Sequence, residues 1–156
     1  MTGKPIIELQ GVSKRFSKPL DVAAKLANML GAGMKEEVVR AVDTVDLVVN
    51  EGEVVGLVGE SGCGKSTLGR IVAGIHKPSD GVVRYRGRDV EELSSADARK
   101  AALAVQMIFQ DPFASLNPRL RVSDIIGEAP RVHGIVKAAD ADRYVDDLMR
   151  RVGLDP

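Results

Sequence analysis

The sequence lacks tryptophan and contains only two tyrosines, three phenylalanines and one cysteine among its 156 residues. So few aromatic side chains argue against a stacking surface for single-stranded nucleic acid. A single cysteine excludes an internal disulfide and is typical of a protein in a reducing compartment. The 22 Lys and Arg residues balance 22 Asp and Glu residues, so the net charge is zero. This balance disfavours nucleic-acid binding through overall charge.

Long apolar runs are also missing. No run approaches the roughly 18 residues that a membrane-spanning helix needs, and no basic segment followed by an apolar one opens the chain. The hydrophobic fraction of 44% is nevertheless sufficient for a core. The sequence therefore predicts a soluble, cytosolic polypeptide of about one domain.

The segment 59–66 reads Gly-Glu-Ser-Gly-Cys-Gly-Lys-Ser and matches the complete phosphate-binding pattern G-x-x-x-x-G-K-[ST]. Glycines allow backbone N–H groups to turn toward phosphate oxygens, and the N-terminus of the following helix attracts the same anion. Lys65 supplies a positive charge for the outer phosphates, and the Ser66 hydroxyl supplies a ligand for magnesium. The residues predicted to bind the nucleoside triphosphate here are Gly59, Glu60, Ser61, Gly62, Cys63, Gly64, Lys65, Ser66 and Thr67.

The sequence around this loop supports the same interpretation. Residues 54–58 form a short apolar run, which predicts a buried parallel strand before the loop. Residues 68–74 then predict the opening of a helix. The alternative, a glycine-rich turn with a solvated lysine, is disfavoured by this order of strand, loop and helix.

The remaining sequence predicts an alternation of strands and helices. Apolar alternation and β-branched residues predict strands, whereas apolar residues at helical spacing predict helices. Asp43 and Thr44 interrupt one strand, and Pro130 is expected to interrupt one helix. The predicted strands are 6–10 with an extension over 12–16, 38–49, 82–86 and 104–109; the predicted helices are 20–30, 95–102, 123–128 and 138–151. The last helix is expected to face inward with Val145, Leu148, Met149 and Val152.

Several segments resemble the ATP-binding subunits of ABC transporters, in the oligopeptide and dipeptide import branch. They are residues 58–68, 106–112, 115–119 and 127–130. The resemblance implies an α/β fold: the P-loop NTPase core of an ABC nucleotide-binding domain, with an antiparallel β subdomain and the start of a helical subdomain, truncated. It implies a division into residues 1–110, with an insert at about 20–40, and residues 111–156, which hold the Q-loop and the beginning of the helical subdomain.

The resemblance also assigns roles to two residues outside the phosphate loop. Phe16 resembles the aromatic residue that stacks on adenine, the alternative being an ordinary core phenylalanine at a strand end. Gln110 resembles the glutamine that reaches magnesium and the nucleophilic water, the alternative being a solvated loop residue. Lys65 and Gln110 are then the implied catalytic residues, Ser66 and Gln110 the implied metal ligands, and ATP and Mg²⁺ the implied cofactors.

Other reactive side chains in the sequence favour simpler interpretations. His76 and His133 are far apart and have no metal-ligand spacing, so both are expected on the surface or in loops. Cys63 is expected to fill space in the phosphate loop, with oxidation sensitivity as a minor hypothesis.

Three elements of the family pattern are not found in this sequence. Four apolar residues followed by Asp-Glu, which would hold magnesium and polarise the attacking water, do not occur. The Leu-Ser-Gly-Gly-Gln signature is absent, since the segment 93–97 lacks both glycines, and the switch histidine has no candidate. We therefore expect the N-terminal part of a longer protein or a truncated product. This chain alone is expected to turn over poorly and to be poorly soluble or partly molten.

The resemblance implies an ATPase subunit that energises peptide import. Its partners would be a second ATP-binding subunit, in a homo- or heterodimer, and transmembrane permease subunits, with no nucleic acid. It would lie in the cytoplasm, peripherally on the inner face of the cell membrane. Alternatives are a nucleotide-binding fragment without hydrolysis, another P-loop enzyme such as a small-molecule kinase, and a DNA-repair ABC ATPase, which the zero net charge disfavours.

Overall fold

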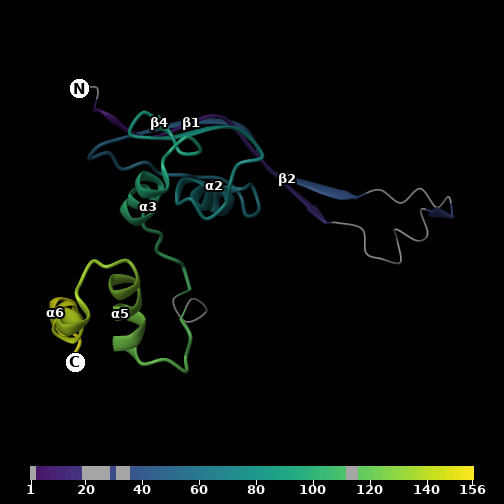
Figure 1. Cartoon of the computed structure of the whole chain (residues 1–156). Coiled ribbons are helices and arrows are strands. Elements are labelled where there is room, and N and C mark those ends of the chain that lie inside the picture. The colour runs from purple at the N-terminus through teal and green to yellow at the C-terminus, as the bar shows by residue number, and fades with distance from the viewer. Residues whose placement is uncertain (1–2, 19–28, 31–35, 112–115) are drawn as a thin grey trace. The chain divides into compact units, whose positions relative to one another are not determined.

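The computed structural model describes residues 3–18, 29–30, 36–111 and 116–156 (Figure 1). These form two compact units, residues 1–107 and 108–156, which are described separately below. The helix expected over residues 20–30 falls largely outside the described residues.

The first unit contains a four-stranded antiparallel sheet. The strands follow the order β2-β1-β3-β4, with β1 at Pro5–Lys18, β2 at Glu37–Asn50, β3 at Asp80–Tyr85 and β4 at Arg88–Asp89. The strands expected at 6–16, 38–49 and 82–86 are thereby confirmed. Because β3 pairs with β1 only from Ile7 to Ser13, the end of β1 after Ser13 pairs with β2 alone.

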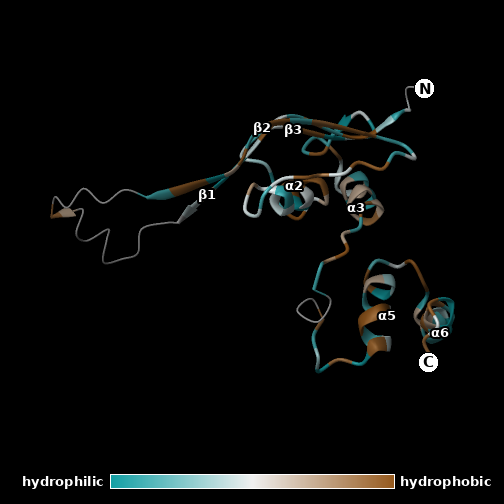
Figure 2. Cartoon of the chain, turned by 180° about the vertical axis from the view of Figure 1, so that it is seen from behind, coloured by the Kyte–Doolittle hydropathy of each residue, from teal (hydrophilic) through white to brown (hydrophobic). Residues whose placement is uncertain are grey.

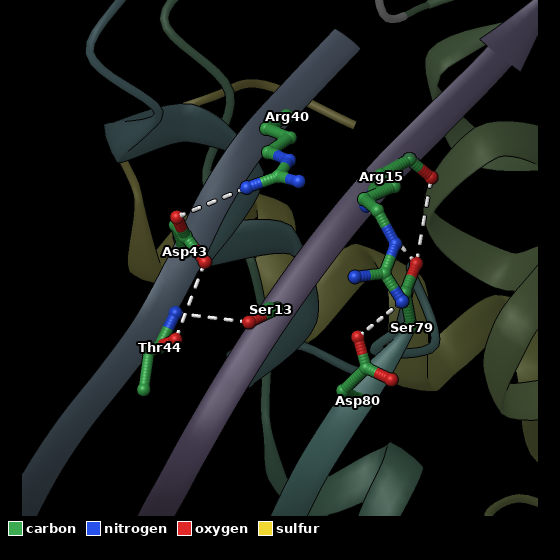
Figure 3. A network of polar contacts seen from close by, with 7 residues as sticks. All are labelled: Ser13, Arg15, Arg40, Asp43, Thr44, Ser79 and Asp80. Carbon is green, nitrogen blue, oxygen red and sulfur yellow. Dashed lines mark hydrogen bonds and ion pairs between the residues drawn. The ribbon is translucent and has the colours of Figure 1, made fainter. Parts of the chain in front are cut away.

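The interruption expected at Asp43 and Thr44 is an irregularity within β2 and does not end the strand. Thr44 has a left-handed backbone, with φ of 49°, and the register between β1 and β2 shifts nearby. The Thr44 N–H donates to Ser13 Oγ at 2.9 Å, and Ser13 is 6% exposed. Figure 3 shows this bond beside the Arg15–Asp80 ion pair, which joins β1 to β3. Side-chain hydrogen bonding therefore supports the irregular strand from its neighbour.

Two helices lie on the same face of this sheet, α2 at Lys65–Val72 and α3 at Ser95–Ala104 (Figure 1). Both confirm helices expected from the sequence, although α2 begins three residues before the expected start. Leu68 and Ile71 of α2 are buried against the sheet and form the core together with Ile7, Leu9, Val12, Val42 and Val83. Ser94 is the N-cap of α3, and its Oγ accepts the Asp97 N–H at 3.2 Å, as expected of a serine at this position.

The strands expected at 54–58 and 104–109 are wrong. Ala104 is the last residue of α3, and residues 53–60 and 106–109 have no strand pairing. Val54, Val58 and Ile108 are 97%, 92% and 96% exposed. A parallel strand that is apolar on both faces is stable only between neighbouring strands. Within the described residues the sheet consists of the four antiparallel strands alone, so the local apolar pattern does not produce a strand.

The second unit contains α5 at Val122–Val132, a 3-10 turn at Ala138–Asp140 and α6 at Ala141–Arg151. Buried Ala141, Val145 and Met149 of α6 form its apolar side. In Figure 2 much of α5 has the colour of hydrophobic residues, whereas hydrophilic residues predominate in α6. Arg131 Nη2 donates to Asp142 Oδ1 at 2.9 Å and links the two helices.

Two expectations for this unit are corrected. Pro130 lies inside α5 and does not interrupt it. Proline lacks the backbone N–H that would donate one turn back, but α5 continues for only two residues beyond Pro130, so the helix loses this one donor close to its end. Val152 is exposed, since α6 ends at Arg151 and the chain leaves the helix there.

Candidate functional site

The phosphate loop leads into the first turn of α2, and its geometry requires glycine at two positions. Gly64 has φ of 97°, and a Cβ at this position would collide with the Ala41 carbonyl oxygen of β2. Gly59 has φ of 155°, and a Cβ there would lie 2.7 Å from Cys63 Sγ. Glycine accepts these backbone conformations and leaves room for the close contacts.

The ammonium group of Lys65 folds back over this loop. Its Nζ donates to the Gly59 carbonyl at 2.7 Å and to the Glu60 carbonyl at 2.6 Å, and lies 3.5 Å from Cys63 Sγ. A lysine ammonium is a mobile point charge with three donors. Phosphate oxygens entering the loop could therefore replace the carbonyl oxygens as its acceptors.

The start of α2 is suited to bind an anion. Its N-cap is Gly64, and within the described chain no side chain caps the helix and no acidic residue lies in its first turn. The first N–H groups of a helix lack intrahelical acceptors and carry a partial positive charge. Ser66 is exposed and Thr67 half-buried in this first turn. Backbone donors, a lysine and a serine hydroxyl thus occur together at the start of one helix, a combination that suits an anion.

Strand β2 forms a wall beside the loop that the sequence did not reveal. A cavity of about 410 Å³ lies between them. Its lining includes Arg40, Ala41, Val42 and Asp43 of β2, with Cys63, Gly64 and Lys65 of the loop. Arg40 Nη1 lies 3.9 Å from Asp43 Oδ2 (Figure 3). A second cavity of about 450 Å³, lined mainly by aliphatic residues of α2, α3 and the sheet, is less suited to a polyanion.

Phe16 lies near the end of β1, opposite Val39 of β2. Its side chain is 39% exposed, so it is not the buried core residue of the alternative interpretation. The ring contacts His76 edge-on, with centroids 5.5 Å apart and planes at 75°. Lys14 Nζ lies 5.2 Å from the ring centroid. The contact with His76 was not predicted, because a separation of 60 residues carries no local signal.

Gln110 belongs to the second unit and is exposed there. Its role toward magnesium and water stays a prediction. Phe16 and the phosphate loop both belong to the first unit.

The donor set fits a magnesium ion that arrives with a nucleotide. Among the described residues, no group of three or more His, Cys, Asp or Glu side chains could hold a metal ion by itself. Mg²⁺ commonly takes one or two protein ligands and completes its shell with phosphate oxygens and water. The exposed Ser66 hydroxyl at the start of α2 is a suitable ligand of this kind.

In the described part of the chain, no helix combines the length and the apolar character needed to cross a bilayer.

Known proteins are similar to this chain in sequence and in fold. A family model described as ABC transporter matches residues 42–156. The oligopeptide transport ATP-binding protein AppF of Bacillus subtilis (strain 168) is 44% identical over 119 residues, covering 76% of this chain and 36% of AppF. OppF of Streptococcus mutans is 39% identical over 153 residues, covering 97% of this chain and 45% of OppF. The dipeptide transport protein DppF of Lactococcus lactis subsp. cremoris is 38% identical, with coverages of 97% and 45%.

Solved structures agree with these relatives. A dimeric bacterial ABC transporter cassette aligns with a TM-score of 0.61 at 25% identity, covering 88% of this chain and 53% of the cassette. A post-hydrolysis dimer of an ATP-binding cassette bound to ADP and Pi aligns with a TM-score of 0.63 at 22% identity, covering 93% and 56%. The α/β fold of an ABC nucleotide-binding domain, with its antiparallel sheet and helices, is thereby confirmed. The chain spans less than half the length of the transport proteins compared above. On the family match over residues 42–156, the chain belongs to the ABC transporter family.

Proposed function

We propose that the phosphate loop binds ATP together with Mg²⁺. The observation that carries the proposal is the convergence of three kinds of donor on one loop: the Lys65 ammonium, the uncapped N–H groups of α2 and the Ser66 hydroxyl. Charge-assisted hydrogen bonds of this kind are shorter and stronger than neutral ones. A triphosphate presents more oxygens than any one donor could satisfy, so the donors act together.

Each residue has a distinct task in this proposal. Lys65 would exchange its carbonyl acceptors at Gly59 and Glu60 for oxygens of the outer phosphates. Ser66 would hold Mg²⁺, which when bound neutralises charge on the phosphates. Phe16 would stack on the base, and Gln110 would orient metal and water. Glu60, Ser61, Gly62, Cys63 and Thr67 would supply loop backbone around the phosphates.

For the whole protein we propose an ATP-binding subunit that energises peptide import. Support comes from the names of its relatives, which are oligopeptide and dipeptide transport ATP-binding proteins. The dimeric cassettes of similar fold support pairing with a second ATP-binding subunit. Permease subunits would then hold the pair at the inner face of the cell membrane. We propose that residues 1–110 belong to the ATP-binding core. Residues 111–156 would contain the Q-loop and the start of the helical subdomain.

We further propose that the 156-residue chain binds nucleotide without sustained hydrolysis. Phosphoryl transfer depends on positioned charges around the γ-phosphate and the attacking water. The sequence contains neither an Asp-Glu pair after four apolar residues nor the glycine-rich signature. Release of phosphate at rates of about 1 s⁻¹ or more, typical of enzymes in general, would contradict this proposal.

Titration with a fluorescent ATP analogue tests the proposed nucleotide site. Lys65→Ala should weaken binding about 10- to 100-fold, as expected when a charged hydrogen-bond partner is removed. Lys4→Ala is the matched control, since it removes an equal charge from exposed chain outside the loop. Equal affinities of the two variants would refute the site.

A further inference from the structure

The aromatic ring of Phe16 lies among groups from two distant parts of the chain. Lys14, two residues earlier on β1, places its Nζ 5.2 Å from the ring centroid. His76, which follows α2, meets the ring at 75° with a centroid separation of 5.5 Å. Both distances lie in the ranges of cation–π and edge-to-face contacts. A half-exposed phenylalanine thus has a defined orientation at an open surface.

The lysine in this cluster is itself fixed. Lys14 Nζ donates to the Lys77 carbonyl at 2.8 Å, so its ammonium is tied to the residue next to His76. The His76 N–H donates in turn to the Arg70 carbonyl of α2 at 3.1 Å. The cluster therefore joins β1 to the C-terminal end of the helix whose first turn carries Lys65 and Ser66.

We propose that Lys14 and His76 are positioning residues that hold the Phe16 ring for stacking against the purine base of the bound nucleotide. The inference rests on the proposed nucleotide site. Lys14 and His76 restrict the ring, while the exposed part of Phe16 offers an apolar surface to the base. Because the same helix joins this cluster to the phosphate loop, base and phosphates are bound by one connected element.

This arrangement predicts how the chain discriminates among ligands. Stacking requires a flat ring and no particular pattern of hydrogen bonds. Purine triphosphates should therefore bind more tightly than pyrimidine triphosphates, whose ring is smaller. Inorganic tripolyphosphate should bind through the loop alone and should not sense changes at Lys14 or His76.

Calorimetric titration with magnesium ATP and magnesium tripolyphosphate tests the proposal on the purified chain. His76→Ala and Lys14→Met should each weaken ATP binding about 3-fold, the value of one aromatic or cation–π contact, and leave tripolyphosphate affinity unchanged. His76→Phe should restore the ATP affinity, because it keeps an aromatic edge. In a Phe16→Ala background neither substitution should have any further effect.

The chain offers matched controls for both substitutions. His133→Ala removes the other histidine of the two in the sequence, and Lys4→Ala removes an exposed lysine of the same strand region. If His76→Ala, Lys14→Met and these controls bind ATP with equal affinity while the wild-type chain also binds ATP, the positioning role of Lys14 and His76 is overturned. The proposed nucleotide site would then still stand. Loss of tripolyphosphate affinity in the same variants would also overturn it, because the effect would then be structural. Failure of the wild-type chain to bind either ligand would refute the nucleotide site itself.

A spectroscopic experiment gives an independent readout. Since the sequence has no tryptophan, Phe16→Trp introduces a single reporter in the cluster. The fluorescence of this tryptophan should be quenched by ATP but not by tripolyphosphate. Adding His76→Ala to this variant should make the fluorescence anisotropy of the tryptophan decay faster in the absence of ligand. An unchanged decay would show that His76 does not restrain the ring and would overturn the proposal.

Discussion

Gly64 is the residue on which the shape of the phosphate loop most depends. Its positive φ and its contact with the Ala41 carbonyl exclude any side chain. Gly64→Ala should destabilise the chain by about 1–3 kcal/mol, the cost of backbone strain at such a position, and should weaken ATP binding. Thermal melts and titrations would measure both effects.

Gly74 provides the control for this substitution. It has φ of 70°, and a Cβ there would meet nothing within 4 Å. Gly74→Ala should therefore show the conformational cost without the collision. If both variants lose the same stability and both bind ATP normally, the contact between loop and β2 has no consequence.

A second prediction for a single residue concerns Ser13. Its buried hydroxyl oxygen accepts the N–H of Thr44. Ser13→Ala would leave that donor without its partner and should cost about 1–2 kcal/mol in the free energy of unfolding. The exposed Ser17 on the same strand is the control, and Ser17→Ala should change stability by less than about 0.5 kcal/mol. Chemical denaturation distinguishes the two.

At the scale of elements, α3 shows how a local sequence specifies a helix start. Asp97 Oδ2 accepts from Arg88 Nη1 at 3.1 Å, and the Asp97 backbone N–H donates to Ser94 Oγ at 3.2 Å. The side-chain hydrogen bond from Arg88 to the carboxylate, followed by one from the Ser94 side chain, lowers the pKa of Asp97 below its ordinary value. The ionised carboxylate is therefore favoured in the folded chain.

The lowered pKa gives a pH dependence of known sign. Its contribution is present above the pKa of the unfolded state, about 3.9, and is lost as the pH falls through the lower pKa of the folded state. Asp97→Asn should lower the melting temperature at pH 7, and the difference from wild type should shrink below about pH 4. Glu92→Gln, which removes an exposed charge nearby, is the control. A difference that stays constant down to pH 2 would contradict this account.

The elements also show what the sequence can and cannot predict. The phosphate loop was recognisable because a few residue types at fixed spacing carry its chemistry. β1, β3 and α3 were recognisable because local patterns of apolar residues determine them. The runs at 54–58 and 104–109 were expected to be buried strands from their local apolar pattern. A parallel strand, however, is stable only when neighbouring strands pair with it, and the local pattern does not reveal whether they do. The contacts around Phe16 escaped prediction for a similar reason, because His76 meets it only in the folded sheet and helix.

For the whole molecule, the exposed apolar side chains of residues 54–58 predict self-association. An unpaired apolar segment is a ready contact for another copy. Val54→Lys should reduce association, measured by light scattering, and should change stability by less than about 0.5 kcal/mol because Val54 is 97% exposed. Val12→Lys, at a fully buried position, should unfold the chain. Comparable unfolding by Val54→Lys would show that this segment is buried.

We propose that backbone N–H groups of residues 59–67, with the Lys65 ammonium, bind the phosphates of ATP. At 16.7 kDa the chain suits amide chemical-shift mapping by NMR during titration with magnesium ATP. We expect magnesium ATP to cause its largest shifts at residues 59–67. Tripolyphosphate should shift the same amides, whereas adenosine should not. Saturating magnesium ATP that left these amides unshifted would contradict this proposal.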